Sequence, residues 1–225
     1  MINRNLFILS VGQIFSFTSP VVSVLLSGII GSAMTEINYL ATLPTALMIV
    51  GTAFGSLIAS KIMKIKGRKF GFSLAAIINS LFSLFCAYAI LINSFTLFCL
   101  GNLIIGLSVA FAQQYRFAAT ESVIKANIPK AISLILLLGI VASLLGANIV
   151  SITKDFHYTT YVGSYISMSI LTIIPFFFFI FYVNEEQIES TKIKSQKSIL
   201  ELLSNKNIQL SILSAGVGYT TMSTL

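Results

Sequence analysis

Charged residues are scarce in this sequence. Only 9% of its 225 residues are Asp, Glu, Lys or Arg, whereas a soluble domain carries about 25%. Hydrophobic residues make up 56% of the chain, and its mean hydropathy is +0.93. Because so apolar a chain has too little polar surface to stay in water, this composition excludes an ordinary soluble protein and predicts one that lies in a lipid bilayer.

Cysteine and histidine are almost missing as well. Cys86 and Cys99 both fall in apolar runs, and His157 is the single histidine. These residues fit neither a disulfide framework nor a metal site. The sequence also lacks an HExxH motif, paired acids within an apolar run, and a nucleophile with a neighbouring base. We therefore expect no metal, no cofactor and no enzymatic activity.

Long apolar runs are what the sequence does contain. A membrane-spanning helix needs about 20 mostly apolar residues, and the alternation of polarity that marks barrel strands is missing here. We predict an all-α, polytopic membrane helical bundle with six full spans and an incomplete seventh. The six spans are expected at residues 6–28, 39–60, 71–92, 95–119, 131–152 and 161–183.

These spans divide the chain into three parts. Residues 1–183 are predicted to form a six-helix transmembrane bundle, and residues 184–207 a cytosolic central loop. Residues 208–225 would then begin a truncated seventh helix. Within the loop, Ser198 and Glu201 fit a capping box, which predicts a short helix at the membrane interface.

Lysine and arginine fall on alternate loops. With a cytosolic N-terminus, the outer loops hold only Lys154 (Arg116 is set aside), and the inner segments hold all the others. Cytoplasmic loops are rich in these residues, so we expect a multi-pass protein of the cytoplasmic (inner) membrane. The residues behind the net charge of +7 then lie on a solvated cytosolic face near anionic lipid. Because this accounts for the charge, no nucleic-acid partner is expected. The inner residues are Arg4, Lys61, Lys64, Lys66, Arg68, Lys69, Lys125, Lys130, Lys192, Lys194, Lys197 and Lys206.

The fourth predicted span ends in the polar stretch QQYR. Gln113 and Arg116 are three residues apart and share a helix face, and Asn102 lies about three turns before Gln113. An arginine within a membrane costs a few kcal/mol, so it usually faces a cavity or a partner. The stretch therefore predicts a substrate-facing or gating site that includes Gln114. Alternatively, Arg116 reaches the membrane interface or pairs with Glu121.

The other spans carry two further patterns. In the first span Ser10, Gln13, Phe17 and Pro20 form one stripe, in which Gln13 contacts either a solute or a neighbouring helix. Glycines predict close contacts between helices, because they let two backbones approach each other. They are Gly51 and Gly55 in the second span, and Gly139 and Gly146, seven residues apart on one face, in the fifth.

The segment GSLIASKIMKIKGRKFGF resembles the loop signature between the second and third spans of the major facilitator superfamily. Gly55, Gly67, Arg68 and Lys69 stand at the matching positions, but the acid expected near position 59 or 60 is absent. The resemblance implies a secondary transporter of a small organic solute that works by alternating access. It also implies that the first and fourth spans line the central cavity, so that Gln13 and Arg116 face one solute.

Together with the loop signature, the segments QQYRFAATE, KAISLILLLGIVASLLG and GVGYTTM are similar to a bacterial branch of this superfamily that includes drug or riboflavin-type permeases. Gly139 and Gly146 resemble the glycine-rich fifth span of its exporters. Glu121 is the one acid placed to act in proton coupling. Because superfamily carriers have two six-span halves, the resemblance implies a second half, or a homodimer of this chain. The alternative is a truncated, non-transporting membrane module for interaction or regulation.

Overall fold

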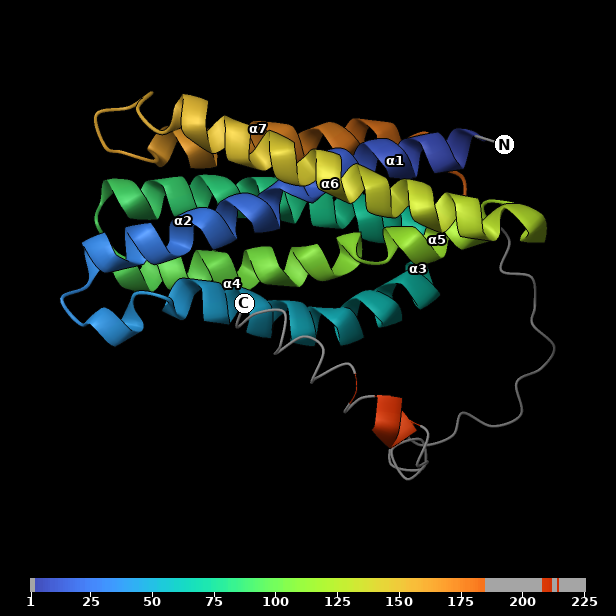
Figure 1. Ribbon diagram of the computed structural model, residues 1–225, viewed down its shortest axis with the longest axis horizontal. Helices are drawn as coiled ribbons and strands as arrows, with labels where there is room; N and C mark the ends of the chain where they lie inside the picture. Colours follow the sequence, from blue (N-terminus) through green and yellow to red (C-terminus); the bar gives the residue numbers. More distant parts are fainter. Residues whose placement is uncertain (1–2, 185–207, 212–213, 215–225) are drawn as a thin grey trace. The chain divides into compact units, whose positions relative to one another are not determined.

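The computed structural model of the protein describes residues 3–184, 208–211 and 214 (Figure 1). The chain divides into two compact units, Met1–Glu185 and Glu186–Leu225. In the second unit, residues 208–211 and 214 are helical. The predicted central loop after Asn184, its capping box and most of the predicted seventh span lie outside the described residues.

The first predicted span consists of two helices, α1 (Arg4–Ser16) and α2 (Thr18–Met34), with Phe17 between them. Asn3 caps α1, because its side chain accepts a hydrogen bond of 2.8 Å from the backbone N–H of Leu6. Pro20 lies in the first turn of α2, where a missing N–H is tolerated. A short 3-10 helix, η1 (Asn38–Leu40), follows α2.

Helix α3 (Leu43–Leu91) contains the second and third predicted spans. It has 49 residues, which at 1.5 Å per residue corresponds to roughly 74 Å of helix. Gly67 interrupts it with φ 82° and ψ 163°, a backbone conformation that essentially only glycine adopts. Two helical arms, 43–66 and 68–91, therefore meet at the glycine of the loop motif.

The rest of the first unit is also helical. α4 (Phe95–Ala112) and α5 (Tyr115–Glu121) cover the fourth predicted span. After η2 (Lys125–Asn127), α6 (Ile128–Thr153) and α7 (Val162–Phe179) correspond to the fifth and sixth. Figure 1 shows the helices of this unit running lengthwise beside one another.

The prediction of an all-α membrane protein is confirmed for the part of the chain that the structure describes. Five helical stretches are long and apolar enough to cross a membrane, which makes this a multi-pass membrane protein. The count of six spans is not confirmed, because the second and third predicted spans fall in the two arms of α3, which forms one of these five stretches. The five stretches are Arg4–Met34, Leu43–Leu91, Phe95–Glu121, Lys125–Thr153 and Val162–Phe179.

Two clusters of buried side chains hold the helices together. The first is centred on Phe72, Tyr115 and Phe179, whose rings contact one another with centroids 4.8–5.7 Å apart. The second is centred on Phe98 and Tyr165, whose ring centroids are 5.6 Å apart. The first cluster connects α3, α5 and α7, and it includes Ile135, which also lines the pocket described next.

Candidate functional site

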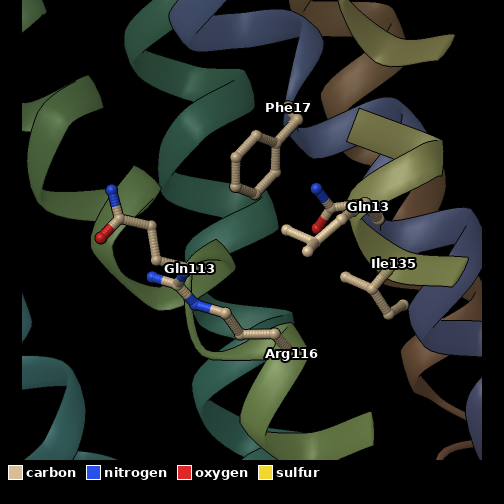
Figure 2. A pocket seen from close by; sticks show the side chains of 6 residues that line it. Gln13, Phe17, Gln113, Arg116 and Ile135 are labelled. Carbon is tan, nitrogen blue, oxygen red and sulfur yellow. The ribbon is translucent and has the colours of Figure 1, made fainter. Parts of the chain in front are cut away.

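A pocket of about 160 Å³ lies between α1, α5 and α6 (Figure 2). Its wall combines two amides, one guanidinium, one aromatic ring and two aliphatic side chains. It can therefore offer hydrogen bonds, a positive charge and an apolar surface to one small molecule. The lining residues are Gln13, Phe17, Gln113, Arg116, Ile135 and Leu136.

Gln13 is the most enclosed polar group of the pocket. The residue is 5% exposed, and its amide has no hydrogen-bond partner among the described residues. The exposed part of the residue opens on the pocket. The amide can offer two donors and one acceptor, so it is available to a ligand. A hydrogen bond from Gln13 to a neighbouring helix, the predicted alternative, does not occur within the described part of the chain.

Arg116 supplies the positive charge. Its side chain is exposed, and its guanidinium carbon lies 5.5 Å from the ring centre of Phe117. The predicted alternative of a pair with Glu121 does not occur, because that carboxylate binds Arg68 instead. Within the described part of the chain Arg116 has no counter-ion, so an anionic or hydrogen-bonding ligand would be its partner.

Helix breaks occur on both sides of the pocket. Phe17 lies between α1 and α2, and Gln113 and Gln114 lie between α4 and α5. The backbone N–H of Gln114 bonds to Phe111 O at 3.0 Å, three residues back, as in a 3-10 turn. The stretch FAQQYRF has no proline or glycine to cause this break. Gln113 thus reaches the pocket from the interruption itself, and Arg116 reaches it from the first turn of α5.

A buried hydrogen bond ties the two broken segments together. The hydroxyl oxygens of Ser16 and Tyr115 are 3.0 Å apart. Tyr115 is 1% exposed and packs against Phe72 and Phe179. The residue between Gln114 and Arg116 is therefore anchored to α1, α3 and α7 at once, which fixes the position of the pocket wall.

Comparison with known proteins identifies the family. The family model described as "Sugar (and other) transporter" matches residues 30–185. The riboflavin transporter RfnT of Brucella anthropi is 33% identical over 169 residues, 75% of this chain and 42% of that protein. The uncharacterized MFS-type transporter YdeG of Bacillus subtilis is 29% identical over 153 residues, 68% of this chain and 36% of that protein. The chain belongs to the major facilitator superfamily. It spans less than half the length of these two curated relatives.

The superfamily loop motif is built around Gly67. Arg68 donates two hydrogen bonds to Glu121, of 2.6 Å from Nε and 2.5 Å from Nη2. Lys69 donates its backbone N–H to the side chain of Asn184 at 2.8 Å. Glu121, predicted as a candidate for proton coupling, thus forms a bidentate ion pair. Arg68 therefore has a carboxylate partner in Glu121, although the acid that the superfamily usually has near position 59 or 60 is absent.

Gly55 of the same superfamily motif packs α3 against α4. A Cβ at Gly55 would lie 2.8 Å from Leu107 O, and one at Gly51 would lie 2.1 Å from Leu103 O. Gly106 of α4 makes the reciprocal approach, 2.0 Å from Met48 O. The GxxxG spacing in the second span indicated this close contact, but Gly106 was missed because it stands outside any such pair.

Asn102 does not reach the pocket, contrary to the predicted shared face. It is completely buried, and its amide donates to Phe98 O at 2.9 Å. Ser27 donates to its side-chain oxygen at 3.3 Å. Gln114 is half-buried and does not line the pocket either. Of the predicted polar groups, the structure brings together Gln13, Gln113 and Arg116.

The sequence reasoning missed a row of buried serines in the first span, beside the face that carries Gln13 and Phe17. Ser16, Ser19 and Ser27 are each at most 5% exposed, and each hydrogen-bonds a different helix. Their spacing of three and then eight residues is that of one helix face, which is the signal that could have revealed them. Their partners are Tyr115, Asn79 and Asn102.

Proposed function

We propose that this chain acts in a secondary transporter of the cytoplasmic membrane and that its pocket binds the transported solute. The observation that carries the proposal is the unpaired polar lining. Gln13 is 95% buried yet makes no hydrogen bond within the described residues, and Arg116 has no counter-ion there. Both groups are therefore open to a solute, and hydrogen bonds to them, one of which would be charge-assisted, would contribute to its binding.

The chemistry of the pocket favours a small organic solute that is anionic or rich in hydrogen-bonding groups. One relative is named a riboflavin transporter, and riboflavin fits this description. Its flat ring system has an imide edge that can pair with the amides of Gln13 and Gln113. The Phe17 ring offers a surface for stacking. Riboflavin is therefore the first solute to test.

We infer that the chain crosses the membrane six times in its first unit, with the N-terminus in the cytosol. Roughly 74 Å of helix in α3 is more than twice the hydrocarbon thickness of about 30 Å. A reversal at Gly67 accommodates both arms. The lysines around it, such as Lys64 and Lys66, would then face the cytosol. A seventh crossing would begin near Ile208.

A second helix bundle would complete the transporting unit. The exposed face of α6 supports this, because only 17% of its most apolar stretch is buried, against 50–61% in the other four. The greater length of the relatives also supports it. The bundle would be either a second copy of this chain or a further part of the polypeptide. The ion pair between Arg68 of α3 and Glu121 of α5 would hold the cytosolic ends of these two helices together during gating.

Uptake of labelled riboflavin into membrane vesicles tests the proposal. Vesicles would carry either the 225-residue chain or the polypeptide expressed from its natural reading frame. Flux with the 225-residue chain indicates a homodimeric carrier, and flux only with a longer product indicates a second bundle on the same polypeptide. Insertion without flux of riboflavin or of other anionic and hydrogen-bonding solutes would instead support a non-transporting membrane module.

A further inference from the structure

Gly139 of α6 lies directly behind the Gln13 amide. A Cβ atom at position 139 would be 3.3 Å from Gln13 Nε2, and no other neighbouring atom of the described chain would be within 4 Å. That distance is tight but does not involve backbone, so a methyl group would displace the amide rather than the helix. The glycine thus leaves a space that only the Gln13 side chain uses.

The position of Gly139 on α6 connects it to the pocket. It follows Ile135 by four residues, so the two lie one turn apart on the same face of the helix. Ile135 is 2% exposed and lines the pocket. Gly146 continues the same face seven residues further, but a Cβ there would meet Val21 at 3.1 Å, away from the pocket.

We propose that Gly139 is a positioning residue that sets the specificity of the pocket by keeping the Gln13 amide in place. The inference rests on the proposed function of the pocket. A hydrogen bond weakens steeply when its distance or angle departs from the optimum. A shift of a few tenths of an ångström would therefore weaken the contact between Gln13 and the ligand. The ligand it selects carries a donor and an acceptor on one edge, as an amide or imide does.

The test is a double-mutant cycle on riboflavin uptake by the natural polypeptide. Gly139→Ala should raise the half-saturating concentration about three- to tenfold, the value of one hydrogen bond, with little change in maximal rate. In a Gln13→Ala background the same substitution should have no further effect. Gly146→Ala is the matched control, and it should change at most the amount of folded protein.

Two results would overturn the inference. One is an equal effect of Gly139→Ala with and without Gln13. The other is an unchanged half-saturating concentration in Gly139→Ala while the wild type transports. Absence of uptake by the wild type would count against the proposed function instead.

A second measurement, which needs no solute, tests whether position 139 affects the side chain at position 13. A cysteine placed by Gln13→Cys, with Cys86 and Cys99 replaced by serine, would be labelled with a small methanethiosulfonate reagent. Gly139→Val should slow this labelling, whereas Gly146→Val should not. Equal labelling rates would show that position 139 has no influence on the group at position 13.

Discussion

The arginine of the pocket is exposed and has no acidic partner among the described residues. A guanidinium carries five donors in a fixed plane, and Arg116 directs them to no carboxylate of the described chain. The one acid near it in sequence, Glu121, is occupied by Arg68. A cation beside two amides that has no acid paired to it in the described chain is open to an anionic or hydrogen-bonding ligand.

Replacing Arg116 by alanine should weaken solute binding strongly. Hydrogen bonds to charged groups contribute about 1.5–3 kcal/mol, so the half-saturating concentration for uptake should rise about ten- to a hundredfold. Arg116→Lys should lose less, because it keeps the charge but not the planar donor geometry. Lys125→Ala serves as the control, since this exposed lysine does not line the pocket. An equal loss in Arg116→Ala and Lys125→Ala would show that only overall charge matters.

Part of the site could be predicted because a helix has a fixed period. Gln113 and Arg116 were placed on one face, and both line the pocket. Asn102 was placed on nearly the same face but is buried against Ser27. The period gives the direction of a side chain but not which helix packs over it. The break at Gln113 and Gln114 also could not be foreseen, since no proline or glycine marks it.

At the scale of helices, apolar runs located the helical segments but not their interruptions. A hydropathy plot shows where apolar runs begin and end, but it carries no information on backbone dihedral angles. Hydropathy therefore did not indicate the break at Phe17 within the first span; the residue that did was Pro20, which can kink the helix because it cannot donate to the carbonyl of Ser16. Around Gly67 the prediction placed a loop between two spans, but the structure has helix on both sides. Gly67 alone, with its positive φ, interrupts α3 there.

Gly67 should be intolerant of any side chain. At φ 82° and ψ 163° a non-glycine residue costs about 1–3 kcal/mol, and a Cβ would also lie 2.5 Å from Asn184 Nδ2. Gly67→Ala should therefore lower the thermal unfolding temperature of the detergent-purified protein. Gly28→Ala is the matched control, because nothing lies within 4 Å of its Cβ and its backbone is helical. If both variants unfold at the same temperature, the reversal at Gly67 is not under this constraint.

At the scale of the whole molecule, the proposed six crossings place residues 64 and 155 on opposite sides of the membrane. Lys64→Cys and Asp155→Cys, each with Cys86 and Cys99 replaced, can be labelled in intact cells by an impermeant thiol reagent. Asp155→Cys should react at once, and Lys64→Cys only after the membrane is permeabilised. Reaction of both positions in intact cells, or the reverse pattern, would contradict the proposed topology.

The two adjacent glutamines allow the most direct test of the pocket as the solute site. Gln113 lines the pocket and Gln114 does not, although both are half-buried in the same break. In the riboflavin uptake assay, Gln113→Ala should raise the half-saturating concentration about three- to tenfold. Gln114→Ala should leave it unchanged. Equal effects of the two substitutions, or an effect of Gln114→Ala alone, would contradict the assignment of this pocket as the solute-binding site.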